Sequence, residues 1–109
     1  MAGLEQDGAA EVVISTAPSA PGRAVISVSG ELDASNAHEL KTVVISIAAT
    51  HRDELIFELS RLRYMDSAGI AVLLDAASRV GAVRLRDPSP AVRRVVELTG
   101  LSEVLPLER

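Results

Sequence analysis

The residues whose types and spacing could do chemistry lie in one short segment, Tyr64-Met65-Asp66-Ser67-Ala68-Gly69-Ile70, between a predicted strand and a predicted helix. Ser67 is in position to cap that helix, because its hydroxyl can accept a hydrogen bond from the unpaired backbone donors of the first turn. Those donors and the helix dipole also favour an anion, and Ala68 and Gly69 leave the backbone open to close approach. The segment therefore predicts either a plain helix cap with Asp66 as a loop acid, or a functional site at Ser67.

Enzymatic chemistry has little support elsewhere in the chain. His38 and His51, the only histidines, are thirteen residues apart, and neither has an acidic partner in a motif. A Ser-His-Asp site built on Ser67 lacks the glycine pattern of a nucleophile elbow, and no phosphate-binding loop or dinucleotide fingerprint is present. Asp33 and Asp66 could form a carboxylate pair, but loop and cap roles explain them more simply. We therefore expect no catalysis, no cofactor and no metal site.

Composition limits the classes of protein to consider. The chain has 109 residues, of which 48% are hydrophobic and 24% charged, as expected for one globular domain over residues 11–109 after a loose tail over 1–10. The net charge of −4 argues against a nucleic-acid partner. No cysteine is available for disulfides or thiolate sites, no apolar run is long enough to cross a membrane, and the acidic N-terminus does not resemble a signal peptide. These features predict a cytoplasmic protein; they leave its oligomeric state open, and we expect a monomer as the free form.

The elements that must position the Ser67 segment follow from hydrophobic periodicity and turn residues. Strands are predicted at 12–14, 25–28, 55–59 and 82–86, and a further short element at 103–107. Helices are predicted from Ala37 to about Ile47, capped by Asp33 or Ser35, from Ser67 to about Val80, and from Pro90, capped by Ser89, to Thr99. This order predicts an α/β domain with a mixed sheet of four or five strands, an edge hairpin formed by the first two strands, and helices packed on the sheet.

The second predicted helix has an unusual outer face. At 100° per residue its core side is formed by Ile70, Leu73, Leu74, Ala77 and Val80. The opposite side carries mostly small or apolar residues with only two charges: Ala68, Ala71, Val72, Asp75, Ala76 and Arg79. Exposed helix faces are usually charged, so this one predicts a docking surface for a partner protein, or else a face covered by another part of the chain.

Three motifs in sequence order resemble those of the STAS domain family. Asp66-Ser67-Ala68-Gly69-Ile70 resembles the family's Asp-Ser-Ser/Thr-Gly-Leu motif, and Gly30-Glu31-Leu32-Asp33 resembles its Gly-Glu-Leu-Asp segment. The C-terminal pattern is Asp87-Pro88-Ser89-Pro90-Ala91-Val92 with Leu98-Thr99-Gly100-Leu101. The resemblance covers roughly residues 11–107 and implies a single STAS-like domain of the anti-sigma-factor antagonist type.

This resemblance implies a phosphorylation switch. In the family the first serine of the motif, here Ser67, is the phosphoacceptor. The unphosphorylated domain binds an anti-sigma factor that is also a serine kinase, which frees the sigma factor, and a PP2C-type phosphatase restores the unphosphorylated state. The residues expected to contact the partner are Asp33, Asp66, Ser67, Ala68, Gly69, Ala71, Val72 and Asp75.

One residue departs from the family pattern. Ala68 stands where the motif usually has Ser or Thr. Alanine at this position is compatible with STAS subunits of phospholipid-transport ABC systems, which bind an ATPase in place of an anti-sigma factor. An accessory subunit of such a transporter is therefore the alternative function.

Overall fold

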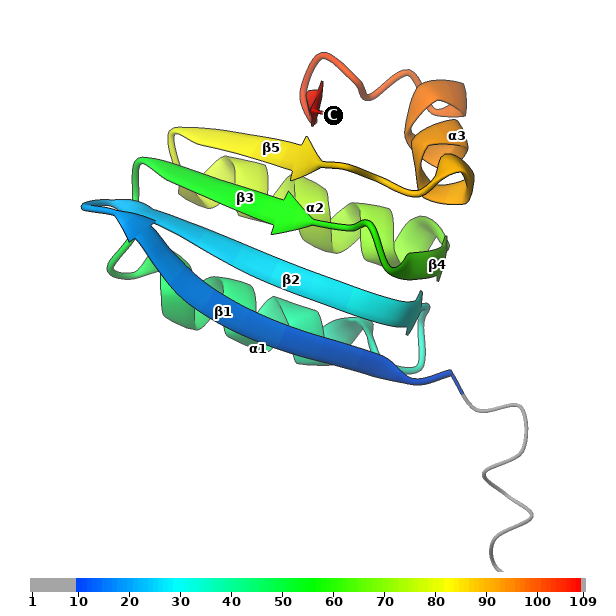
Figure 1. Cartoon of the computed structure of the whole chain (residues 1–109), viewed down its shortest axis with the longest axis horizontal. Coiled ribbons are helices and arrows are strands. Elements are labelled where there is room, and N and C mark those ends of the chain that lie inside the picture. The colour runs from blue at the N-terminus through cyan, green and yellow to red at the C-terminus, as the bar shows by residue number, and fades with distance from the viewer. Residues whose placement is uncertain (1–9, 109) are drawn as a thin grey trace, which may run out of the picture.

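A computed structural model describes residues 10–108 as one sheet with three helices (Figure 1). The predicted tail therefore lies outside the described residues except for Ala10. The elements in chain order are β1 (Val12–Ala20), β2 (Arg23–Leu32), α1 (Ala37–Ala48), β3 (Glu54–Glu58), β4 (Leu62–Met65), α2 (Ser67–Arg79), β5 (Ala82–Arg86), α3 (Pro90–Leu98) and β6 (Leu107–Glu108).

The sheet is mixed, with a path of five strands in the order β1-β2-β3-β5-β6. β1 and β2 form an antiparallel hairpin at one edge, and the other pairs are parallel. β4 pairs with β2 beyond the end of β3, so β3 and β4 lie one after the other along the same side of β2. The predicted fold class and edge hairpin are confirmed.

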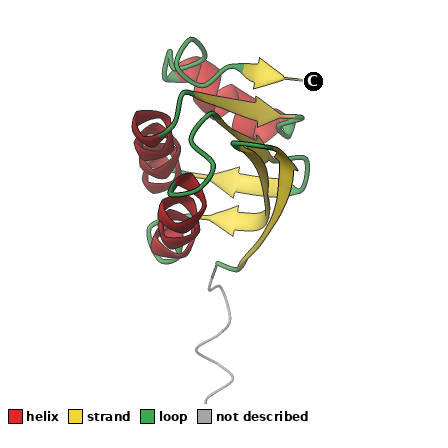
Figure 2. Cartoon of the chain, turned by 90° about the vertical axis from the view of Figure 1, so that its left-hand side faces the viewer, coloured by secondary structure: helices red, strands yellow, loops and turns green. Residues whose placement is uncertain are grey.

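The three helices differ in where they pack. α1 and α2 lie side by side on one face of the sheet, which gives two layers, while α3 lies at the end of the sheet against β4 (Figures 1 and 2). Ser89 connects α3 to that strand, because its hydroxyl donates to the Leu62 carbonyl at 2.6 Å and also caps α3 by accepting from the Val92 N–H. The largest fully buried side chains come from both layers: Phe57, Ile26, Leu32, Leu40, Leu55, Leu59, Leu62, Leu73, Leu85 and Leu105.

Several predicted boundaries were wrong. β1 extends through Pro18 to Ala20, because Pro18 lies near the turn in an edge strand, where an absent N–H is tolerated. β2 continues past Gly30 to Leu32; Gly30 has φ +96°, and a Cβ there would collide with the Glu11 carbonyl. β4 was not predicted as a separate strand, since Ser60-Arg61 and Arg63 interrupt the apolar run.

Candidate functional site

Two loops meet at the end of the sheet where the parallel strands β2 and β4 finish. Leu32 and Met65, the last residues of these strands, are register partners, and the Asp66 N–H donates to the Leu32 carbonyl at 3.2 Å. Asp33 and Asp66 therefore follow directly after paired residues, although 33 positions separate them in the sequence. The parallel pairing brings the turn before α1 beside the N-terminus of α2.

The cap of α2 is Asp66, and the prediction that Ser67 caps this helix was wrong. The Asp66 carboxylate accepts from the N–H of Ala68 at 2.8 Å and from that of Gly69 at 3.4 Å. Asp66 has extended backbone dihedral angles, φ −108° and ψ −167°, because it continues from β4, so its side chain can turn back over the first turn of α2. Ser67 is the first helical residue; it is exposed, and its hydroxyl bonds to none of the described residues.

The turn before α1 also differs from the prediction, which had Asp33 or Ser35 as its cap. The N-cap position belongs to Asn36, and its side chain makes no capping bond. Asn36 is buried and instead bridges the turn, accepting from the Asp33 N–H at 3.0 Å and donating to the Glu31 carbonyl at 2.9 Å. The Asp33 carboxylate accepts from the hydroxyl and the N–H of Ser35, and these two bonds lower the pKa of Asp33. Asp33 is thus held ionised beside the start of α2.

The outer face predicted for α2 is only partly on the surface. Val72 is 6% exposed and Ala76 is fully buried, so placing them on an open face was wrong. Ile70 and Leu73 are buried as predicted, while Leu74, Ala77 and Val80 are half-buried. The physical reason is that α1 packs along one side of α2, which widens its buried arc toward Val72. Ala71 is exposed, and Ala68 and Asp75 are half-buried.

Gly69 is another predicted contact residue that the structure places in the core. A Cβ at this position would lie 2.5 Å from Met65 Cγ and 2.8 Å from Leu32 Cδ2. The glycine allows α2 to start directly over the ends of β2 and β4. Gly69 therefore positions Ser67, and its burial removes it from the contact surface.

A groove between α1 and α2 opens beside the start of α2. It is a cavity of about 320 Å³ lined by Ala37, His38, Lys41, Ala68, Ala71, Val72 and Asp75. The three residues from α1 were missed as part of the site, although Ala37 and Lys41 are four positions apart and so lie on one side of that helix. The second histidine, His51, lies beyond the other end of α1, where Nδ1 lies 3.0 Å from the Thr50 hydroxyl and 3.2 Å from the Ile47 carbonyl.

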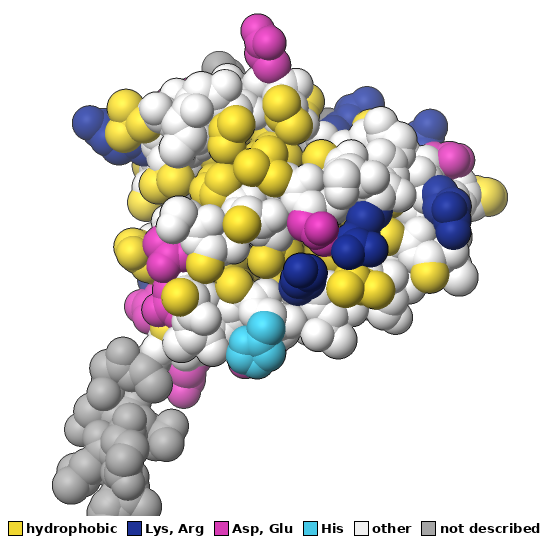
Figure 3. All heavy atoms as spheres, turned by 180° about the vertical axis from the view of Figure 1, so that it is seen from behind, with side chains coloured by type: hydrophobic (Ala, Val, Ile, Leu, Met, Phe, Trp, Pro, Cys, Tyr) yellow, Lys and Arg dark blue, Asp and Glu magenta, His cyan; other side chains and the backbone are white. Residues whose placement is uncertain are grey.

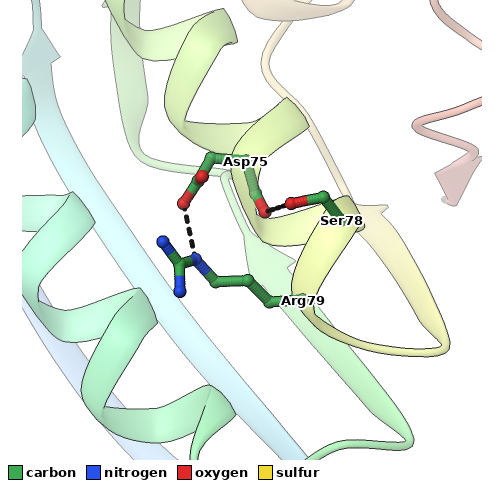
Figure 4. A network of polar contacts seen from close by, with 3 residues as sticks. All are labelled: Asp75, Ser78 and Arg79. Atoms are coloured by element: carbon green, nitrogen blue, oxygen red, sulfur yellow. Dashed lines mark hydrogen bonds and ion pairs between the residues drawn. The ribbon is translucent and has the colours of Figure 1, made fainter.

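The groove carries charges on both sides. On α2, Asp75 Oδ2 accepts from Arg79 Nε at 2.8 Å, while the Ser78 hydroxyl donates to the Asp75 carbonyl (Figure 4). The hydrogen bond from Arg79, aided by the positive charges of Arg79 and Lys41, lowers the pKa of Asp75 against the opposing effect of burial. Acidic, basic and apolar side chains therefore lie next to one another on the helix-covered face (Figure 3).

Within residues 10–108, no three His, Asp or Glu side chains are grouped closely enough to hold a metal ion. No helix in that part of the chain is long and apolar enough to span a membrane. The arrangement offers an exposed serine, a neighbouring carboxylate and a groove.

Comparisons with known proteins give consistent matches. The family model described as Mlab, STAS domain, matches residues 15–107. The anti-sigma-F factor antagonist RsfA of Mycobacterium tuberculosis is 34% identical over 89 residues, which span 76% of this chain and 70% of RsfA. The anti-sigma F factor antagonist of Paenibacillus polymyxa is 26% identical over 89 residues, 76% of this chain and 75% of that protein.

Solved structures agree with the sequence matches. The crystal structure of an anti-sigma factor antagonist from Mycobacterium paratuberculosis superposes with a TM-score of 0.81 at 28% identity, covering 90% of this chain and 86% of that one. Unphosphorylated SpoIIAA, an anti-sigma factor antagonist, superposes with a TM-score of 0.77 at 24% identity, covering 89% of each chain. This second likeness concerns the fold.

Proposed function

The chain belongs to the STAS domain family, and from that premise we propose that it is an anti-sigma factor antagonist that binds its partner through the surface around Ser67. The names of its relatives support this class of function. The observation that carries the proposal is the position of Ser67: exposed, at the first turn of α2, with no bond from its hydroxyl to any described residue. A serine that neither caps nor packs is available to a partner.

We further propose that phosphorylation of Ser67 switches this binding off. The anti-sigma factor, acting as a serine kinase, would transfer the γ-phosphoryl group of ATP to Ser67 Oγ and release ADP, and a PP2C-type phosphatase would hydrolyse the phosphoserine. Phosphate adds about −1.5 to −2 charges at neutral pH. The phosphate would lie beside the Asp66 carboxylate at the first turn of α2, and burial against a partner would leave its charge uncompensated. The helix N-terminus still tolerates the phosphate in the free protein, so docking is lost while the fold remains.

The test begins with affinity capture on the immobilised chain and identification of the bound protein, followed by calorimetry with that protein purified. Wild type and Ser67→Ala should bind with similar affinity, and Ser67→Asp should bind at least about tenfold more weakly because of its desolvated charge. Ser102→Asp is the matched control, since Ser102 is exposed in the turn after α3 and does not line the groove. Equal affinities for wild type and Ser67→Asp would refute the switch.

The alternative, an accessory subunit of a phospholipid-transport ABC system, has Ala68 in its favour, since the hydroxyl usual at that position is absent. It predicts that an ABC ATPase is captured, and that the complex is indifferent to a charge at Ser67. The same three proteins therefore separate the two functions.

Three accompanying expectations follow from the proposed function. A protein that binds an anti-sigma factor works in the cytoplasm, without nucleic acid or membrane insertion, and we propose that the free chain is monomeric. We also propose that it has no catalytic activity of its own. Turnover of an ester or phosphate substrate that Ser67→Ala abolishes would contradict this last expectation.

A further inference from the structure

The groove between α1 and α2 has two parts, each a separate cavity. Its first part, of about 320 Å³, has an apolar lining made mainly of alanines: Ala37, Ala68 and Ala71. A second cavity of about 290 Å³ lies farther along the same two helices, between Ile45 and Ala48 of α1 and Arg79 of α2. α1 has twelve residues and is therefore about 18 Å long at 1.5 Å per residue. The small side chains leave room for those of another protein.

The charges at the groove are not balanced. Asp75 is already engaged by Arg79 at 2.8 Å on the α2 side. Lys41, exposed on the α1 side, forms no hydrogen bond or ion pair with any residue from 10 to 108. Its charge nevertheless reaches Asp75, whose pKa it helps to lower, which agrees with their shared lining of the cavity. The ammonium group of Lys41 is therefore available beside the apolar lining of the cavity, next to His38.

We propose that this groove receives a segment of the anti-sigma factor in which an apolar side chain lies next to an aspartate or glutamate, whose carboxylate pairs with Lys41. The inference rests on the proposed function and adds the chemistry of the partner. Charge complementarity supports this occupant, because an acidic segment balances Lys41 while its apolar neighbour covers the alanines. Ala68 lines the groove and follows Ser67, so a phosphate on Ser67 would also repel this acidic segment.

Lys41 is the only lysine of the 109 residues, which permits a direct test. A water-soluble carbodiimide activates a carboxylate of the purified anti-sigma factor identified by capture; the deprotonated Lys41 amine attacks the activated carbonyl, an amide forms and a urea leaves. Peptide mapping should find Lys41 joined to an acidic residue of the anti-sigma factor. Lys41→Arg should abolish this adduct while keeping the affinity within about twofold, because the charge is retained.

Affinity measurements complete the test. Lys41→Glu should weaken binding by about tenfold or more, and high salt should reduce the wild-type affinity toward that of Lys41→Gln. Arg94→Glu makes the same change of charge at an exposed residue of α3 and should stay within twofold of wild type. If wild type binds but Lys41 is absent from the adduct and Lys41→Glu binds within twofold of wild type, the groove inference is overturned while the proposed function stands. If wild type binds no anti-sigma factor, both are overturned.

Discussion

Because Asp66 caps α2 and Ser67 does not, replacing each residue by alanine should change the stability of the protein by different amounts. Replacing Asp66 by alanine removes both capping bonds, of which the one to Ala68 N, at 2.8 Å, is short and the one to Gly69 N, at 3.4 Å, is long. The two bonds together are therefore equivalent to about one full capping interaction. We expect Asp66→Ala to lower the free energy of unfolding by about 1 kcal/mol, within the range of about 0.5–2 kcal/mol for such changes. Ser67→Ala removes no hydrogen bond to a described residue at an exposed position and should change stability by less than about 0.5 kcal/mol.

Urea denaturation followed by circular dichroism measures both effects, provided that the slope with denaturant is unchanged. For a domain of this size, 1 kcal/mol corresponds to a fall in melting temperature of roughly 4–8 °C. Asp66→Asn is the control, because asparagine is also a good N-cap and should retain most of the stability. A loss for Ser67→Ala as large as that for Asp66→Ala would show that the serine hydroxyl has a structural role, and would refute the assignment of the cap to Asp66 alone.

Two further predictions concern α2. Val72→Glu should destabilise the protein by at least about 3 kcal/mol, since it removes a side chain that is only 6% exposed and buries a charge. Ala71→Glu, at the exposed neighbouring position, should cost less than about 0.5 kcal/mol in the same denaturation assay. Equal losses would refute the assignment of Val72 to the buried side of α2 and Ala71 to the exposed side. The pKa of Asp75, followed by NMR of its carboxyl carbon, should lie below the ordinary value and rise in Arg79→Gln. Because this pKa is lowered by folding, its contribution to stability is present above the unfolded pKa of about 3.9 and is lost as the pH falls through the folded value.

The local chemistry of the chain determined much of its architecture. Periodic apolar residues specify the helices, β-branched runs specify most strands, and Ser89 followed by Pro90 specifies the start of α3, because these signals depend on neighbours within a few positions. The same local information placed Ser67 at the start of α2 on the surface. It also gave the two segments that contain Asp33 and Asp66, through their resemblance to family motifs.

Only the tertiary structure decided how these pieces function together. Asp66 caps α2 because the pairing of β4 with β2 holds Asp66 in an extended conformation. This pairing joins segments far apart in the chain, so the periodicity of the sequence does not predict it. Val72 was placed on the wrong side because a 100° projection gives the direction of a side chain and cannot tell which neighbouring helix will cover it. The groove has the same origin: Lys41 and Ala71 are 30 residues apart, and they line one cavity only because α1 and α2 pack side by side on the sheet.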